Sequence, residues 1–198
     1  MASRFVDYLN TRGTYAVGNL NSWEMEQINQ GALVSETNGI ENFTMVELFF
    51  EHEDPTDTST PVVRKCKKLT DVTKPQYLIA SIERRVFEND NILGLMQEEL
   101  SDFYNAKGEQ AAIYHVPVGK RIQVSKFALC AETGSEVTAI VNGMGAYFDA
   151  TLGKFVIVDL TKAPTNYTNS SKKFVVVANG DEIATLCGQQ LVGLEAIS

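Results

Sequence analysis

From residue 43 to the C-terminus the sequence is a succession of short apolar runs separated by turn-forming residues. Aromatic and β-branched residues dominate the runs, and Gly, Pro, Asn or Asp recurs between them about every 8–12 residues, which is typical of an antiparallel sandwich or barrel. A chain of 198 residues is long enough to bury such a core. We therefore predict a mainly β (α+β) fold, an antiparallel β-sandwich or barrel, over residues 41–198.

The first 40 residues have a different composition, rich in Asn, Gly, Thr and Gln. The sequence thus predicts an extended N-terminal arm at 1–40 and a mainly β globular domain at 41–198. Isolated apolar residues in such an arm need a surface that buries them. We expect four of them to bind a partner or the body of the chain: Tyr15, Trp23, Ile28 and Leu33. We also expect the body to fold when residues 1–40 are deleted. The truncated protein should no longer assemble.

The first two apolar runs, 43–53 and 62–69, flank a polar loop and predict an antiparallel hairpin. Opposite charges across paired strands contribute roughly 0.2–1 kcal/mol each and help to set the register. The predicted register places charges of opposite sign face to face, Glu51 with Arg64 and Glu47 with Lys68.

One principal helix is predicted at 90–104, where apolar residues recur at three- and four-residue spacing. The remaining runs predict strands, most of them joined by turns that contain Gly. These strands are 111–116 with 121–129, 136–141, 146–150 with 154–160, 173–178 with 182–187, and 191–197.

No group of residues in the sequence indicates a reaction. The three cysteines, Cys66, Cys130 and Cys187, are widely spaced and form no C-x-x-C pair, so we expect buried reduced thiols. His52 lies among acidic residues, but neighbours on a strand point to opposite faces and do not converge on a metal. Neither a G-x-S-x-G nucleophile motif nor a complete phosphate-binding fingerprint occurs. We expect no catalytic residue, no cofactor and no metal, and hence no enzyme.

The net charge of −8 is accompanied by no basic patch, which argues against nucleic-acid binding. No apolar run approaches the length of a membrane span, so we expect no membrane association. The N-terminus lacks the basic and apolar regions of a signal peptide, and synthesis in a cytoplasm is expected. An enzyme or small-molecule binder with a site formed by residues distant in sequence remains open.

Several segments together resemble the auxiliary virion proteins of tailed bacteriophages, the decoration or cement subunits on the outside of capsids. They are the Asn/Gly/Thr-rich arm at 10–40, the meander at 110–129, and the runs at 142–148 and 153–158. The resemblance implies an oligomeric β subunit of the virion, made in the host bacterial cytoplasm, that binds and stabilises the capsid through protein–protein contacts. Capsid or other virion proteins and further copies of the chain are the implied partners. A capsid, tail or connector subunit is the alternative within the same class.

Overall fold

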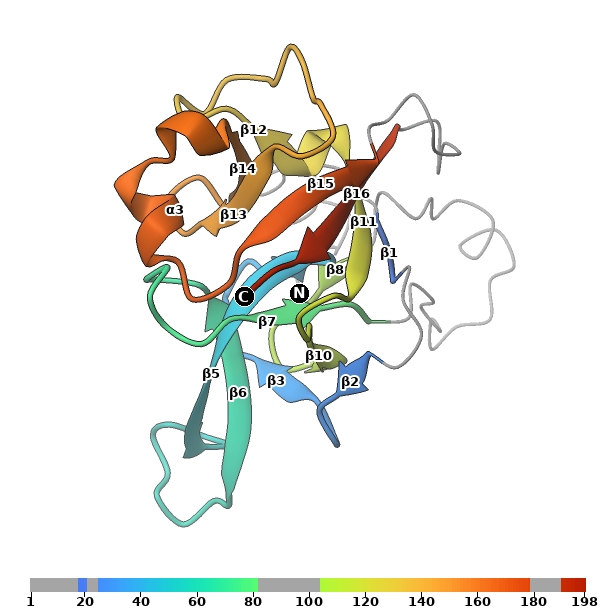
Figure 1. Ribbon diagram of the computed structural model, residues 1–198. Helices are drawn as coiled ribbons and strands as arrows, with labels where there is room; N and C mark the ends of the chain where they lie inside the picture. The colour runs from blue at the N-terminus through green and yellow to red at the C-terminus, as the bar shows by residue number, and fades with distance from the viewer. Residues whose placement is uncertain (1–17, 21–24, 82–103, 179–189) are drawn as a thin grey trace, which may run out of the picture.

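The computed structural model describes residues 18–20, 25–81, 104–178 and 190–198. These residues form two seven-stranded sheets and one two-stranded sheet, and the α-helix among them is the short α3, Thr165–Asn169 (Figure 1). Within this part of the chain the strands do not close into a barrel. The mainly β, sandwich-like prediction is confirmed. The helix predicted at 90–104 lies outside the described residues, apart from Tyr104, which belongs to a strand.

The first sheet has the strand order β1-β11-β16-β15-β13-β14-β12. Its neighbours are antiparallel except for β12 and β14, which run parallel. Two 3₁₀ helices, η2 (Lys126–Ala128) and η3 (Leu160–Lys162), adjoin its strands. The strands are β1 (Gly18–Leu20), β11 (Arg121–Ser125), β12 (Leu129–Cys130), β13 (Gly145–Asp149), β14 (Lys154–Val158), β15 (Phe174–Ala178) and β16 (Leu191–Ala196).

The second sheet has the order β2-β10-β7-β5-β6-β3-β9, with β3 and β6 parallel. Its strands are β2 (Glu26–Gln27), β3 (Ala32–Val34), β5 (Thr44–His52), β6 (Val62–Lys68), β7 (Tyr77–Ile79), β9 (Gln110–Ala111) and β10 (Ile113–His115). The two-stranded sheet pairs β4 (Ile40–Glu41) with β8 (Tyr104–Asn105).

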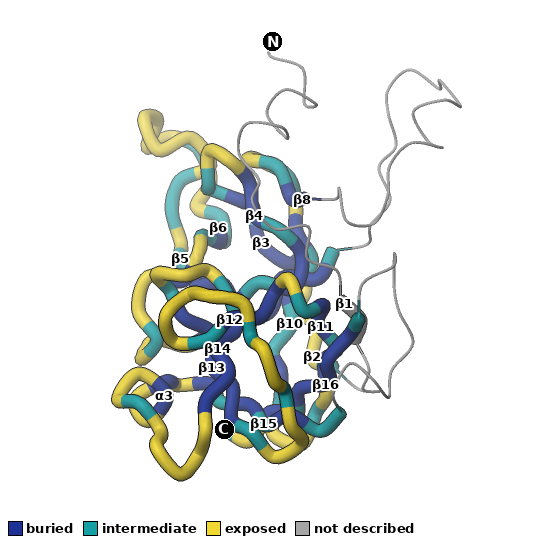
Figure 2. The backbone as a smooth tube through the Cα atoms, turned by 90° about the horizontal axis from the view of Figure 1, so that it is seen from above, coloured by how far each residue is buried: buried dark blue, intermediate teal, exposed yellow. Residues whose placement is uncertain are grey.

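The main hydrophobic core contains residues of both large sheets, among them Met45 and Leu78 of the second and Phe155 and Phe174 of the first. Phe155 is fully buried, and its ring meets those of Phe148 and Phe174 edge to face at centroid distances of 5.2 and 5.6 Å. Figure 2 shows buried strands of the first sheet as dark blue segments beneath exposed loops. Aromatic contacts of this geometry stabilise a core beyond the area that they bury.

The second sheet curls around a core of its own. Residues from β3, β4, β5, β6, β7, β9 and β10 contribute to it, and Ala112 alone separates β9 from β10 in the chain. The outer face of the first sheet has a third cluster, in which Tyr167 of α3 meets Tyr147 at 6.2 Å. Strand β14 is therefore buried on both sides, since Phe155 points to the main core and Val156 to this third cluster.

Two predicted elements are wrong. The runs at 111–116 and 121–129 do not form a hairpin, because β10 lies in the second sheet and β11 in the first. Between them Val116 is fully buried in the main core, so the chain crosses from one sheet to the other. No strand forms at 136–141, which is a loop with mostly exposed residues. The hairpins at 43–53 with 62–69 and at 146–150 with 154–160 are confirmed.

The described residues of the predicted arm pair with the body. Strand β1 lies beside β11, β2 beside β10, and β3 between β6 and β9. The turn before β3 fits closely against β9, because a Cβ on Gly31 (φ +52°) would lie 1.9 Å from the carbonyl oxygen of Ala111. Ala32, Val34 and Ile40 are at most 2% exposed. The described residues of 1–40 thus belong to both large sheets and to the core of the second, and folding of the body without residues 1–40 stays a prediction.

Truncation of a buried side chain from this region tests the arrangement. Ile40 is 1% exposed, and Ile40→Ala should lower the free energy of unfolding by about 2–4 kcal/mol through lost burial and a residual cavity. The measurement is urea unfolding followed by tryptophan fluorescence and circular dichroism. Val118→Ala, at a position that is 65% exposed, is the control and should change stability by less than about 0.5 kcal/mol. Equal stability of the two variants would contradict a structural role for Ile40.

Candidate interaction surface

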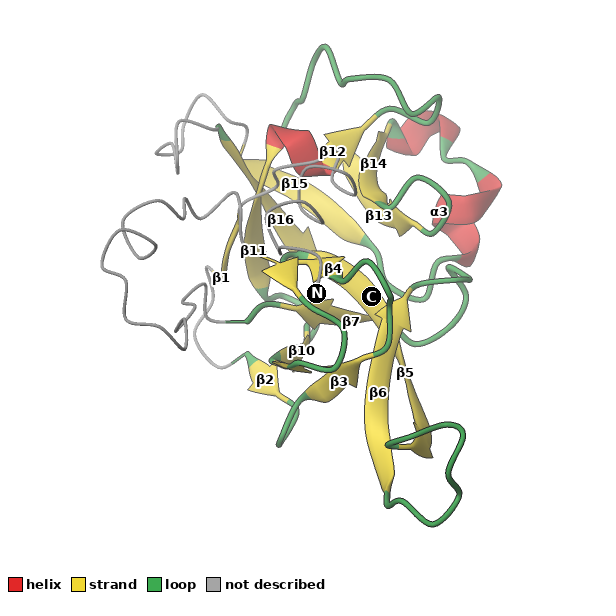
Figure 3. Ribbon diagram, turned by 180° about the vertical axis from the view of Figure 1, so that it is seen from behind, coloured by secondary structure: helices red, strands yellow, loops and turns green. Residues whose placement is uncertain are grey.

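The hairpin β5–β6 extends beyond the rest of the second sheet (Figures 1 and 3). On one side of β5 the neighbour is β7, which pairs with residues 44–46 and no further. In a continued ladder Pro75 would stand opposite Leu48. Proline has no N–H to donate, so the ladder cannot extend past Gln76 in this direction. The outer half of β5 consequently projects without a neighbour on that side among the described residues.

The hydrogen-bond pattern of the hairpin shows which backbone groups of β5 point away from β6. The N–H of Glu53 donates to the carbonyl of Pro61 at 2.9 Å, in the same ladder that pairs Glu51 with Val63. In an antiparallel pair, alternate residues bond to the same neighbour. Odd-numbered residues of β5 therefore bond to β6, and the backbone N–H and C=O of Leu48, Phe50 and His52 point away from it.

The register of the hairpin differs by one residue from the predicted one. Glu47 stands opposite Lys67, and Glu51 opposite Val63, where the sequence predicted Lys68 and Arg64. A one-residue shift would turn every side chain of one strand to the other face. The observed register places Leu48 opposite the fully buried Cys66, so apolar matching decides it. The charges still pair, Glu47 with Lys67 at 2.9 Å and Glu51 with Lys65 at 3.1 Å.

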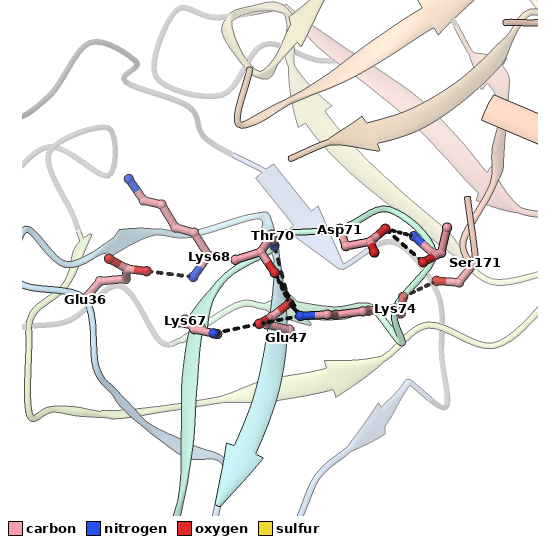
Figure 4. A network of polar contacts seen from close by, with 9 residues as sticks. Glu36, Glu47, Lys67, Lys68, Thr70, Asp71, Lys74 and Ser171 are labelled. Carbon is pink, nitrogen blue, oxygen red and sulfur yellow. Dashed lines mark hydrogen bonds and ion pairs between the residues drawn. The ribbon is translucent and has the colours of Figure 1, made fainter. Parts of the chain in front are cut away.

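Glu47 is the centre of a polar cluster at the root of the hairpin (Figure 4). Its side chain is 8% exposed, and its carboxylate forms ion pairs with Lys67 at 2.9 Å and Lys74 at 3.1 Å. The hydroxyl of Thr70 donates to it at 2.8 Å, and the backbone N–H of Thr70 at 3.3 Å. These contacts join β5, β6 and the segment that leads into β7.

Burial and hydrogen bonding act in opposite directions on this carboxylate. Burial by itself raises the pKa of Glu47, but the bonds from Lys67, Thr70 and Lys74 outweigh it and lower the pKa from 4.5 to about 2. The folded state thus favours the ionised form. Because the pKa is lower in the folded than in the unfolded chain, the stabilisation is complete above pH 4.5 and is lost as the pH falls towards 2.

Removal of this charge should produce a pH-dependent loss of stability. Since both lysines are partly exposed, we expect Glu47→Gln to lower the free energy of unfolding by about 1–2 kcal/mol at pH 7. The difference from the unsubstituted protein should shrink between pH 4.5 and pH 2.5, measured by urea unfolding. Glu53→Gln, at an exposed position of the same hairpin, is the control and should have little effect at any pH. A difference that stays constant across this range would contradict the role of the Glu47 charge.

A groove of about 660 Å³ lies beside the outer half of β5. Apolar and aromatic side chains line most of it, and Arg64, Lys67, Lys74 and Glu47 supply its charges. The guanidinium of Arg64 lies 5.7 Å from the ring centroid of Phe50 and donates to the carbonyl of Asn29 at 3.0 Å. The ammonium of Lys67 lies 5.4 Å from the centroid of Phe49. Three cations against one carboxylate make the groove positive on a protein of net charge −8.

The four predicted partner-binding residues lie in different parts of the chain, and their role in binding stays a prediction. Tyr15 and Trp23 lie outside the described residues. Ile28 lines the groove and packs against the core of the second sheet, so it adjoins this surface. Leu33 is half-buried in β3, opposite Lys65 and Gln110, and does not line the groove.

The remaining residues considered for chemistry have structural contacts. His52 Nδ1 lies 2.6 Å from the carbonyl of Thr60, and His115 Nδ1 lies 3.0 Å from the carboxylate of Glu26. Cys66 and Cys130 are buried free thiols, as predicted, while Cys187 is not among the described residues. Burial, together with the Glu36 carboxylate, raises the pKa of Cys66 to about 12. The helices in the described part of the chain lack the length and apolar character that crossing a membrane requires.

Sequence reasoning did not identify Phe50, Arg64, Lys74 or Tyr77 as members of one surface. Of these residues, Phe50 alone has a local sequence signal for surface exposure, because it is an aromatic residue near the outer end of a hairpin strand, away from the core. It is 69% exposed. The others approach it only through the pairing of β5 with β6 and β7.

Comparison with known proteins gives consistent results over the whole chain. The YonC prophage protein family matches residues 11–197. The SPbeta prophage-derived protein YonC of Bacillus subtilis (strain 168) is 38% identical over 198 residues, which are 100% of this chain and 99% of that protein. No solved structure matches.

Proposed function

The chain belongs to the YonC prophage protein family and is therefore phage-derived, and from this premise we propose that it is a structural protein of the virion. Its role in this proposal is that of a capsid decoration subunit, which binds the outside of the capsid and stabilises it through protein–protein contacts. Synthesis in the host bacterial cytoplasm precedes incorporation into the particle.

The projecting hairpin is the observation that carries the proposal. Two large apolar side chains near its end are exposed, Phe50 at 69% and Val62 at 58%. Both stand on the same face, because Phe50 is opposite Arg64 and Val62 is opposite His52 in the ladder. Exposed apolar side chains that gather on a projecting element mark a surface for protein association. A hairpin with such a face suits insertion between the subunits of a capsid.

The electrostatics of the adjoining groove favour binding over catalysis. A general base works best with a pKa near the ambient pH. The pKa of Glu47, the carboxylate of the groove, is about 2, and two lysines hold it ionised. Glu47 thus serves to fix the shape of the surface. A capsid, tail or connector subunit would use the same hairpin in the same way and is the alternative within this proposal.

A particle-binding experiment tests the function. Purified protein is mixed with phage particles that lack it, and bound protein is quantified after sedimentation and located by cryo-electron microscopy. The double variant F50T/V62T places a β-branched threonine in both strands, which suits a strand, and removes apolar surface. We expect it to bind at least about tenfold more weakly, because truncation of central interface residues typically has this effect, and to keep the thermal unfolding of the unsubstituted protein.

The control is V118T/V141T, which changes two side chains of similar exposure, 65% and 60%, away from the hairpin. It should bind as the unsubstituted protein does. Binding to the tail or to the portal vertex would select the alternative virion component. Absence from every part of the particle would refute a structural role in the virion.

A further inference from the structure

Arg64 is the cation of the groove that has no acidic partner within the described part of the chain. We propose that its guanidinium is a receptor for a carboxylate of a partner protein. The groove would then bind an exposed segment of that partner in which an acidic residue stands beside a large apolar residue. The inference rests on the proposed function for the identity of the partner, a capsid protein, whereas the chemistry of recognition can be tested separately.

Hydrogen bonds to the backbone hold the guanidinium of Arg64 in place and leave one side of it open. Its Nη1 donates to the carbonyl of Asn29 at 3.0 Å and to that of Gly31 at 3.3 Å. An arginine has five N–H donors, and Nη1 carries two of them. The donors on Nε and Nη2 have no hydrogen-bond partner among the described residues. Together they form a planar fork that matches the two oxygens of a carboxylate.

Apolar side chains adjoin Arg64 on its face of the hairpin. Arg64 stands opposite Phe50 in the ladder, and its guanidinium lies 5.7 Å from the centroid of that ring. Phe50 is 69% exposed. Leu48 and Tyr77 lie half-buried on the same face and line the groove together with Ile28. A carboxylate bound at Arg64 would thus have apolar and aromatic surface beside it, which suits an apolar neighbour in the bound segment.

The other charges of the groove favour the same ligand. Lys67 and Lys74 share the carboxylate of Glu47, so this cluster retains one net positive charge (Figure 4). Glu47 is the one carboxylate among the described residues that line the groove. The side chains of Lys67 and Lys74 are 38% and 47% exposed and can be reached by a ligand. With Arg64, the groove has an excess of two positive charges, and such an excess attracts an acidic segment.

The size and the surroundings of the groove favour a short peptide segment over a nucleic acid. Its volume of about 660 Å³ lies within the range of about 300–1,000 Å³ that is usual for pockets that enclose small ligands. A nucleic acid needs a row of cations along its phosphates. The end of the hairpin instead carries Glu53, Asp54 and Asp57, and hydrogen bonds within the loop lower the pKa of both aspartates. A long phosphate backbone would pass these charges, whereas a short segment ends within the groove.

Two capped peptides that differ in one group test the chemistry of the groove. Their sequences are Gly-Leu-Asp-Phe-Gly and Gly-Leu-Asn-Phe-Gly, and each is titrated into the ¹⁵N-labelled full chain. Binding is followed at the Nε–Hε NMR signal of Arg64, which is assigned by its absence from the spectrum of Arg64→Lys. We expect the aspartate peptide to shift this signal and to bind at least about fivefold more tightly than the asparagine peptide, because charge-assisted hydrogen bonds to a carboxylate are the stronger ones.

Particle binding connects the groove with the capsid. Arg64→Lys keeps the positive charge but loses the planar fork. We expect it to weaken binding to phage particles that lack the protein by at least about tenfold. If Arg64→Lys also changes the thermal unfolding, the two peptides decide, since they are compared on the unsubstituted protein.

Arg121→Lys is the matched control for the particle experiment. Arg121 lies in β11 of the first sheet and does not line the groove. Its Nε already donates to the carboxylate of Glu195 at 2.7 Å, so its fork is occupied within the chain. The variant should bind the particle and the aspartate peptide as the unsubstituted protein does.

Equal affinity of the two peptides, or no binding of either, would overturn the proposal. Tighter binding of oligothymidylate than of the aspartate peptide would overturn it in favour of a nucleic acid, and a dimer that Arg64→Lys dissociates would overturn it in favour of a second copy. Unchanged particle binding by Arg64→Lys, together with loss of binding by F50T/V62T, would refute the role of the groove and leave the proposed function standing. Selective binding of the aspartate peptide without any binding to the particle would refute the proposed function and leave the carboxylate receptor standing.

Discussion

The buried carboxylate of Glu47 holds together the part of the molecule on which the candidate surface depends. A charge at this depth is tolerated only when it is paired and hydrogen-bonded. Lys67 satisfies it from β6, and Thr70 and Lys74 satisfy it from the segment before β7. The same contacts hold the root of the hairpin against the segment that leads through Pro75 into β7. Glu47, Lys67 and Lys74 also line the groove, so the same contacts shape the surface beside the outer half of β5.

The fold class could be predicted from the sequence because turn residues and apolar runs are local signals. Hairpins whose two strands are joined by a short turn, such as β13–β14, were predicted correctly for this reason. The crossing from β10 to β11 was missed, since a turn signal at 117–120 indicates a change of direction but not which sheet the next strand joins. Burial of Val116 between the sheets decides that, and it is a property of the assembled core.

The register of β5 and β6 shows why a site is harder to predict than a fold. Pairing by charge gave a register one residue away from the observed one. Glu47 and Glu51 each have a basic partner in either register, so charge does not discriminate between them, whereas burial of Leu48 against Cys66 does. The hydrogen bonds of the loop between β5 and β6 fit the observed register. Asp54 and Asp57 each accept a backbone N–H two residues ahead, and Glu53 then closes on Pro61. Ile28 and Tyr77 reach the groove from separate strands, and no local pattern in the sequence brings them together.

An open strand edge exposes a protein to uncontrolled association, and natural sheets usually cover or interrupt such edges. Here the open stretch is only five residues long, between the end of the β7 pairing and a loop that begins with Glu53 and Asp54. A net charge of −8 on each chain opposes less specific contacts. The short length of the open stretch and the acidic residues of the loop that follows it thus act together to disfavour a growing sheet.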